Sequence, residues 1–234
     1  MPLLSGGWSD YVELPVGAIV HKIDPVMNPE LAVLLEPFSI GMKAVRLAAL
    51  NNDDTVVILG PGPIGLLTVV AAAEAGAKTI ILAGATGDDE RLALGRELGA
   101  HVTIDVTTSD LLAEIRRQNR GMLATRSIDT TGTTHGFELA IAVLARGGVM
   151  VTVGGSALDA TASISPTDLV MRQIDIRASQ LGANHYESCL EILAGGRYPL
   201  ERLVTHRYPL ARIEEALLTF ERRGPCIKPV IVFA

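Results

Sequence analysis

The sequence predicts an α/β protein with a doubly wound, mostly parallel sheet of six strands. Short β-branched runs alternate with helical patterns from about residue 55 onward. Glycine turns follow the apolar runs that end at Leu59 and Val153. Glycine is typical of the point where a strand ends and a loop begins. Hydrophobic residues make up 48% of the chain and the mean hydropathy is +0.34, which is enough for a substantial core.

The predicted strands are short runs containing Val or Ile, at 55–59, 78–83, 102–104, 127–129, 149–153 and 174–178. Helical patterns fill the intervals, namely 66–75, a stretch from Asp88 or Asp89 to 98, a stretch from 109 through 115, 136–145, and a helix opened by Ser165-Pro166. Asp and Ser suit the N-cap and Pro the first helical position, whereas glycine suits the end of a helix. Strands that alternate with helices favour parallel pairing through helical crossovers.

The two ends of the chain show a different pattern. Residues 1–30 carry Gly6-Gly7 and several prolines among short apolar stretches such as 11–14, and we expect pieces of β structure there. The far end predicts an amphipathic helix over 212–221 and a strand over 228–233. We therefore divide the chain into residues 1–35, 36–182 and 183–234, with the first and last segments belonging to a second module.

The composition narrows the class of protein. A net charge of −6 with no basic patch argues against nonspecific nucleic-acid binding. The most apolar region, 55–85, is broken by glycine, proline and charged residues, which argues against a membrane span. Cys189 and Cys226 have neither metal-type spacing nor the density of a disulfide scaffold, and residues 1–10 lack the features of a signal peptide. We expect a cytoplasmic protein.

The most informative motif is the glycine turn Gly60-Pro61-Gly62-Pro63-Ile64-Gly65, because a predicted strand precedes it and a predicted helix follows. This order makes the first half of a dinucleotide-binding unit. Gly60 is expected to make the tight turn, Gly62 to let the backbone approach a pyrophosphate, and Gly65 to let the helix pack close to the strand. We expect the backbone groups of Pro63, Ile64 and Gly65 to be the hydrogen-bond donors to the pyrophosphate at the helix N-terminus. A purely structural turn is the alternative interpretation.

Further cofactor contacts are expected where other strands end. Thr130-Thr131 follows the fourth predicted strand, and Val153-Gly154 follows the fifth. A parallel sheet of this kind binds its ligand at the carboxyl ends of its strands, so these four residues are predicted to bind the cofactor. Ordinary loop structure is the alternative.

The form of the coenzyme stays open at this point. An NAD-binding unit usually ends its second strand with Asp or Glu, whereas Ala83-Gly84-Ala85-Thr86 contains no acid. This absence removes the main repulsion against a 2′-phosphate, and Arg91 is a candidate partner for such a phosphate. The neighbouring acids at 88–90 oppose an NADP interpretation, and Arg91 is also a plausible surface residue of a helix. The cofactor is therefore NAD or NADP.

Several segments resemble one known family when taken in chain order. They are Gly6-Gly7-Trp8-Ser9-Asp10-Tyr11-Val12, Glu36-Pro37 with Ala44-Val45, Arg91-Leu92 through Glu97-Leu98-Gly99-Ala100, Arg146-Gly147-Gly148-Val149 with Val153-Gly154, and Leu203-Val204-Thr205-His206 through Ile213-Glu214-Glu215-Ala216. Together they resemble the medium-chain dehydrogenase/reductase family, which includes zinc-type alcohol, sorbitol and threonine dehydrogenases. Several independent matches in order are more specific than one glycine motif.

The resemblance implies a Rossmann domain at 36–182, with remnants of a GroES-like catalytic β domain at both ends. In family members a longer segment before the position of Gly6 carries the first zinc ligands (a Cys and a His-Glu pair), the proton-relay hydroxyl and any four-Cys structural zinc site. None of these is found in this sequence. Glu36 matches a metal-proximal carboxylate of some relatives and is the only candidate zinc ligand; a plain helix-entry Glu before a proline is the alternative.

The resemblance also implies an activity, namely hydride transfer between a primary or secondary alcohol, or a polyol, and NAD(P). Zinc polarises the substrate oxygen in intact relatives, and the zinc site is expected to be incomplete here. No catalytic residue is assigned. Two alternatives are an NAD(P)-binding fragment without catalysis and one half of a split dehydrogenase. The expected partners are a small alcohol and a second copy of the chain, since the sixth strand joins its counterpart in family dimers; a homodimer or a homotetramer is expected.

Overall fold

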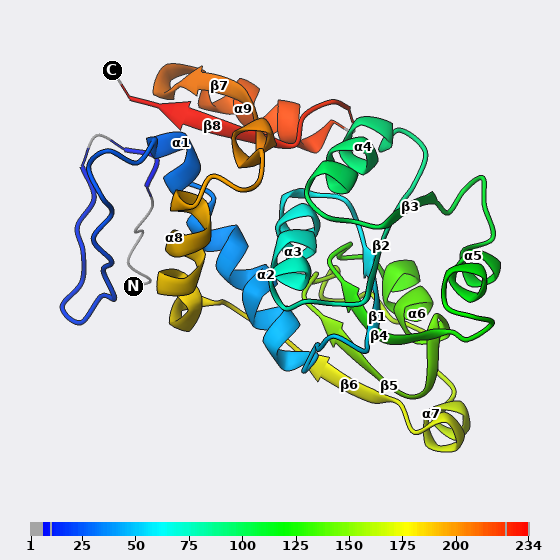
Figure 1. Cartoon of the computed structure of the whole chain (residues 1–234). Coiled ribbons are helices and arrows are strands. Elements are labelled where there is room, and N and C mark those ends of the chain that lie inside the picture. Colours follow the sequence, from blue (N-terminus) through cyan, green and yellow to red (C-terminus); the bar gives the residue numbers. More distant parts are fainter. Residues whose placement is uncertain (1–6, 10, 223, 234) are drawn as a thin grey trace.

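Six parallel strands form the central sheet, in the spatial order β3-β2-β1-β4-β5-β6 (Figure 1). The strands are β1 Thr55–Leu59, β2 Thr79–Gly84, β3 Val102–Asp105, β4 Ala124–Asp129, β5 Leu144–Thr152 and β6 Asp175–Ala178. The computed structural model describes residues 7–9, 11–222 and 224–233, so Gly6 and Asp10 of the first family-like segment lie outside the described residues. The chain winds outward from β1 to β3 and then returns to place β4 beside β1. This order confirms the predicted doubly wound sheet and puts its switch point between β1 and β4.

Helices cover both faces of this sheet. They are α1 Pro29–Ala32, α2 Leu35–Leu47, α3 Pro63–Glu74, α4 Asp89–Glu97, α5 Leu111–Gln118, α6 Thr134–Ala142, α7 Pro166–Arg172, α8 Tyr186–Ala194 and α9 Ile213–Glu221. Val56 and Ile58 of β1 join the core on the side of α2, α3 and α4, whereas Val57 and Leu59 join the core on the side of α5 and α6. Because β1 is buried on both faces, its residues form a continuous apolar run rather than an alternating one.

The helix starts that the sequence marks are largely as predicted. Asp110 caps α5 by accepting from the amides of Leu112 and Ala113, and Ser165 caps α7 ahead of Pro166. The helix expected to begin at residue 66 begins earlier, at Pro63.

The prediction of a helix over 136–145 was wrong at its end. The helix α6 stops at Ala142, and β5 already begins at Leu144, which pairs with Ala124. The register of β4 and β5 then shifts before Val149 pairs with Arg126. Gly147, with φ of +77°, lies within this irregular stretch of β5 instead of ending a helix.

The last segment of the chain forms a small unit beside the large sheet. The strands β7 Val204–Pro209 and β8 Lys228–Val232 pair in parallel, and α9 packs beside them (Figure 1). The predicted C-terminal helix and strand are thereby confirmed within one residue. In contrast, residues 7–9 and 11–28 contain no strand, so the β structure expected there is not found in the described part of this segment.

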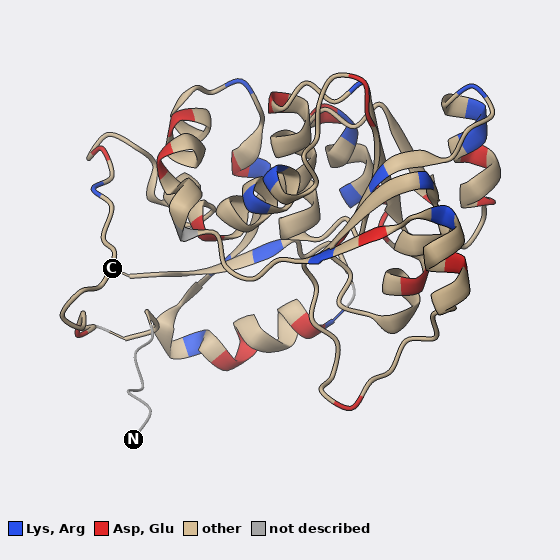
Figure 2. Cartoon of the chain, turned by 90° about the horizontal axis from the view of Figure 1, so that it is seen from below, with Lys and Arg blue, Asp and Glu red and all other residues tan. Residues whose placement is uncertain are grey.

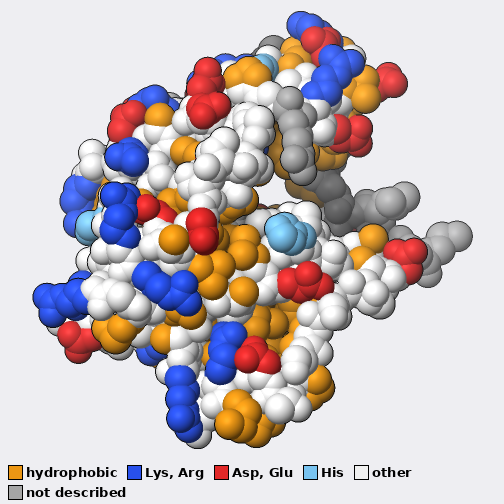
Figure 3. Space-filling view, turned by 90° about the vertical axis from the view of Figure 1, so that its right-hand side faces the viewer, with side chains coloured by type: hydrophobic (Ala, Val, Ile, Leu, Met, Phe, Trp, Pro, Cys, Tyr) orange, Lys and Arg blue, Asp and Glu red, His pale blue; other side chains and the backbone are white. Residues whose placement is uncertain are grey.

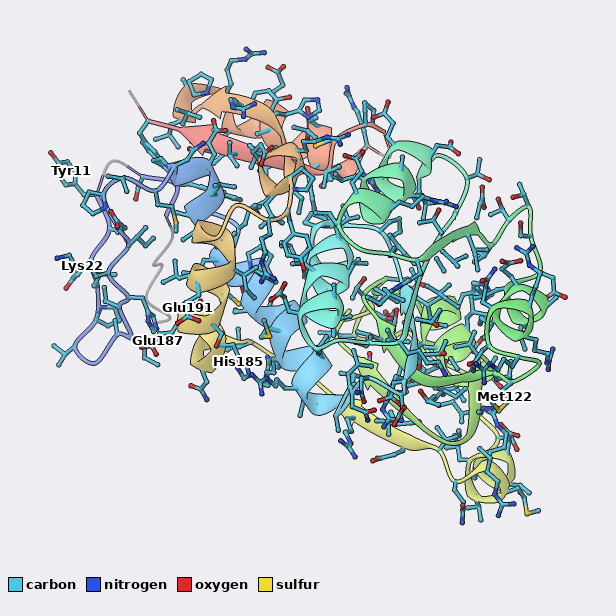
Figure 4. All side chains as sticks on the ribbon, viewed as in Figure 1. Tyr11, Lys22, Met122, His185, Glu187 and Glu191 are labelled. Atoms are coloured by element: carbon cyan, nitrogen blue, oxygen red, sulfur yellow. The ribbon has the colours of Figure 1, made fainter. Side chains whose placement is uncertain are left out.

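The first described residues lie on the outside of the molecule. Tyr11 is 94% exposed, and Tyr11 and Lys22 project away from the body of the protein (Figure 4). Behind them, α8 packs against α2, so the segment after β6 returns to the large sheet before it reaches β7. The division at 1–35, 36–182 and 183–234 stays a prediction.

Charged residues of both signs are interspersed along the ribbon in Figure 2. No helix among the described residues is long and apolar enough to cross a membrane.

Candidate dinucleotide-binding site

The glycine turn between β1 and α3 is shaped by two close approaches. Gly60 has φ of +96°, a conformation that residues with a side chain rarely adopt, and its amide donates to the carbonyl of Ala83 on β2 at 2.9 Å. A β-carbon on Gly65 would lie 1.8 Å from the carbonyl oxygen of Gly60. The turn and the first turn of α3 are therefore in contact at a distance that only glycine permits at position 65.

The N-terminus of α3 is open at the same place. A β-carbon on Gly62, the N-cap, would meet nothing within 4 Å. The amide of Leu66 makes the first bond of the helix, to the carbonyl of Gly62, so the amides of Ile64 and Gly65 precede the helical ladder. Pro63 has no N–H, so its predicted role as a donor is wrong; its ring instead presets the φ of the first helical residue.

A cavity of about 660 Å³ lies over the carboxyl ends of β1, β2 and β4. Its lining comprises Leu59, Gly60, Pro61, Gly62, Ala83, Gly84, Ala85, Thr86, Gly87, Asp88, Arg91, Val106, Thr130, Thr131, Thr133, His135, Gly136, Leu139 and Gly224. Figure 3 shows hydrophobic side chains gathered around a hollowed region near the middle of the face that it presents. The cavity occupies the switch point of the sheet, where ligands of this fold class bind.

The structure brings together half of the predicted cofactor-binding residues. Gly60, Gly62, Arg91, Thr130 and Thr131 line the cavity. The Oγ1 of Thr130 lies 2.8 Å from the carbonyl oxygen of Leu59 and 2.9 Å from that of Gly60, so it braces the glycine turn from β4.

Val153 and Gly154 are outside the lining of this cavity. Their amides donate to the carbonyl of Asp129, and a β-carbon on Gly154 would lie 2.2 Å from the nitrogen of Gly132. In this structure the pair therefore packs the end of β5 against the loop that follows β4. Their predicted contact with the cofactor stays a prediction.

A buried carboxylate fixes that loop. Asp129, which is 1% exposed, accepts from the backbone amide of Thr131 at 2.9 Å and from its hydroxyl at 2.6 Å. Burial raises the pKa of the Asp129 carboxyl above its ordinary value, and the hydrogen bonds from Thr131 act in the opposite direction. Asp129 thus holds the Thr130-Thr131 turn against the edge of the cavity.

Arg91 lies at the rim with its guanidinium already engaged. Nη1 donates to Asp88 at 3.0 Å, and Nη2 donates to the carbonyls of Cys226 at 2.6 Å and Gly224 at 3.3 Å. Arg91 is thus more than a surface residue of α4, because it ties that helix to the C-terminal segment.

Sequence reasoning missed several residues of the lining. Val106 directly follows β3, so the argument about strand ends that singled out Thr130 could also have identified it. Asp88 was interpreted as a helix cap, yet its side chain makes no cap bond and turns back toward β2. His135, Leu139 and Gly224 carry no local signal, because only the packing of α6 and the C-terminal segment brings them to the cavity.

Glu36 lies apart from this cavity, in the first turn of α2, and its side chain is exposed. Ser39 donates through Oγ to the backbone carbonyl of Glu36 at 2.6 Å. Burial lowers the pKa of Lys228, and the charge of Glu36 acts in the opposite direction. No group of three or more His, Cys, Asp or Glu that could hold a metal exists among the residues described, so these residues do not fit a zinc site by themselves.

The strand order, the glycine turn and the cavity at the switch point define a dinucleotide-binding fold. The model of the zinc-binding dehydrogenase family matches residues 63–195, and the chain belongs to that family. It is 30% identical over 233 residues to L-galactonate-5-dehydrogenase of Escherichia coli (strain K12), and the match covers 97% of this chain and 66% of that enzyme.

Solved structures agree with this assignment. An alcohol dehydrogenase of Escherichia coli CFT073, described as short-chain and complexed with NADH, superposes with a TM-score of 0.81 at 25% identity, covering 91% of this chain and 62% of that one. A zinc-binding dehydrogenase described as putative, from Sinorhizobium meliloti 1021 and bound to NADP, gives a TM-score of 0.78 at 25% identity, covering 84% and 58%. The chain thus spans about two thirds or less of the length of each of these proteins.

Proposed function

We propose that this chain binds a nicotinamide dinucleotide in the cavity at the switch point and serves a dehydrogenase that oxidises an alcohol or polyol, or reduces the corresponding carbonyl. The observation that carries the proposal is the open N-terminus of α3 at Gly62, beside a cavity of about 660 Å³. That volume lies within the usual range for small-molecule sites. Two of the relatives, an L-galactonate-5-dehydrogenase and an alcohol dehydrogenase complexed with NADH, support the same class of reaction.

The residues present fit the coenzyme in separate ways. The amides of Ile64 and Gly65 are placed to donate to the diphosphate, and the partial positive charge at the start of α3 favours that anion. The absence of a side chain at Gly62 lets the diphosphate come close to the backbone. Val106 and Leu139 give the lining apolar side chains, which suit the flat base of the coenzyme.

This placement gives the coenzyme and the protein different roles in the reaction. When bound, the nicotinamide supplies the hydride acceptor or donor, and the protein contributes position and electrostatics. Holding the ring at a fixed place lowers the entropic cost of bringing it to the substrate. We assign no catalytic acid, base or metal ligand to the described residues, and Glu36 stays a predicted metal neighbour.

A second candidate is a coenzyme-binding chain without catalysis of its own, or one half of a split dehydrogenase. One observation favours it: no group of three or more His, Cys, Asp or Glu that could hold a metal lies among the residues that the structure describes. We keep the homodimer or homotetramer and the cytoplasmic location expected from the sequence as further elements of the proposal.

Two measurements test the proposal. Titration of the chain with NADH and NADPH, followed by heat or by nucleotide fluorescence, should show saturable binding; no change at millimolar ligand would contradict it. Formation of NAD(P)H from a panel of alcohols and polyols, with zinc added, then separates the two candidates. Turnover supports the dehydrogenase, whereas binding without turnover supports the second candidate.

A further inference from the structure

Asp88 returns its carboxylate to the end of β2, although it stands beyond the place where an acid is expected. The turn reverses at Gly87, which has φ of +91°, and the amide of Asp88 donates to the carbonyl of Ala85 at 3.0 Å. The Oδ2 of Asp88 accepts in turn from the amide of Ala85 at 3.0 Å. A β-carbon on Gly84, the last residue of β2, would lie 3.1 Å from that same oxygen.

We infer that Asp88 selects the coenzyme form without a 2′-phosphate, so that the chain prefers NAD(H) to NADP(H). This inference rests on the proposed function. In dinucleotide-binding folds the adenosine ribose lies at the end of the second strand, where a carboxylate accepts from its hydroxyls. Asp88 lines the cavity and places its carboxylate at this strand end. A 2′-phosphate there would meet a like charge, which costs affinity.

The carboxylate keeps the capacity to accept from a ribose. Oδ1 accepts from Nη1 of Arg91 and Oδ2 accepts from the amide of Ala85. An ionised carboxylate oxygen accepts about two hydrogen bonds, so each oxygen retains one position for a hydroxyl. Both oxygens are also held in place before any ligand arrives, which lowers the entropic cost of recognition.

Arg91 is not placed to reverse this preference. Recognition of a phosphate by arginine uses a pair of free N–H groups of the guanidinium. Here Nη1 is bound to Asp88, Nη2 is bound to the carbonyls of Gly224 and Cys226, and Nε is buried without a partner. Arg91 is the one Lys or Arg in the lining of the described cavity.

The experiment compares NADH with NADPH on the intact chain and on two variants. The Asp88→Asn variant removes the charge and keeps the shape. The Asp89→Asn variant is the matched control, because it removes the same charge from an exposed neighbouring side chain. Far-UV circular dichroism and the melting temperature establish that each variant is folded. Asp88→Ser serves as a second variant if Asp88→Asn does not fold.

The unaltered chain should bind NADH at least about tenfold more tightly than NADPH. Asp88→Asn should lower that ratio by about tenfold, through weaker NADH binding and tighter NADPH binding, while Asp89→Asn changes it by less than about threefold. Equal or tighter binding of NADPH by the unaltered chain overturns the inference and leaves the proposed function standing. An unchanged ratio in folded Asp88 variants also overturns it. Binding of neither nucleotide overturns the proposed function itself.

Discussion

The backbone of Gly65 leaves no room for a side chain, because a β-carbon there would lie 1.8 Å from the carbonyl oxygen of Gly60. The two glycines therefore act as one unit. Gly60 turns the chain at the end of β1, and Gly65 allows α3 to begin directly over that turn. This contact places the first amides of α3 beside the cavity, so it links the fold to the proposed binding of a diphosphate.

Replacing Gly65 should damage stability and binding together. In Gly65→Ala the new methyl group meets backbone rather than a movable side chain, so α3 must shift away from β1. We expect a loss of about 2–3 kcal/mol in the free energy of unfolding, measured by urea titration, and loss of NADH binding. Unchanged stability in Gly65→Ala would show that the turn and helix are not packed as described.

Replacing Gly62 should separate binding from stability. A β-carbon at Gly62 meets nothing within 4 Å and its φ of −72° is ordinary, so Gly62→Ala should leave the melting temperature within a few degrees of the unaltered chain. The methyl group would stand where the diphosphate approaches, and we expect NADH binding to weaken by about tenfold or more. Gly7→Ala, also in open space, is the control for a methyl group added elsewhere. Equal binding by Gly62→Ala and Gly7→Ala would place the diphosphate elsewhere.

Asp54 is part of a buried polar network before β1, and removing its carboxylate should lower the stability of the protein by a large amount. Asp54 is 4% exposed, accepts from Thr125 at 2.7 Å and from the amide of Asn51 at 3.0 Å, and lies 3.4 Å from Arg126. Asp54→Ala leaves these buried partners without the carboxylate that they contact. The free energy of unfolding should therefore fall by about 3 kcal/mol. Asp53→Ala, at an exposed neighbour, should change it by less than about 0.5 kcal/mol. A small effect at Asp54 would count against this network.

The pKa of Asp129 predicts a dependence of stability on pH. Because burial raises this pKa above 3.8, the folded chain holds the proton at pH values where the unfolded chain has released it. The contribution of Asp129 to stability is therefore fully present below about pH 3.8 and is lost as the pH rises through the raised value.

Asp129→Asn isolates this contribution, since the amide oxygen still accepts from Thr131 and carries no charge. The free energy of unfolding of the unaltered chain minus that of Asp129→Asn should fall as the pH rises above 3.8, measured by urea titration at several pH values. A difference that rises with pH would mean that the folded protein favours the charged carboxylate.

The free edge of β6 predicts the oligomeric state. β6 ends the sheet opposite β3, and Ser179 donates inward to the carbonyl of Thr152 on β5. Since backbone amides alternate in direction along a strand, the amide of Ala178 points to the open edge. By light scattering we expect a dimer with twice the 24.8 kDa mass of one chain, or a tetramer of two such dimers, and Ala178→Pro should remove the pairing through β6 with the fold retained. A monomeric unaltered chain would contradict pairing through β6.

Local sequence patterns predicted most of the helices and strands correctly. The β-branched run 55–59, the glycine turn and the caps at Asp110 and Ser165 each specify a conformation over a few residues, and the structure follows them. The boundary between α6 and β5 was mispredicted because Leu144 pairs with Ala124, and no local signal announces that pairing.

By itself the sequence determined the alternation of strands and helices, the glycine turn and its place at the start of α3, because periodicity and backbone freedom are local properties. Only the tertiary structure decided which side chains face the cavity. The bond from Arg91 to the carbonyl of Cys226 joins positions 135 residues apart, so the sequence alone gives no sign that this guanidinium is already engaged. The position of Asp88 likewise depends on how one turn reverses in space. The segment 83–86 contains no acid, and this turn brings the carboxylate of Asp88 to the end of β2.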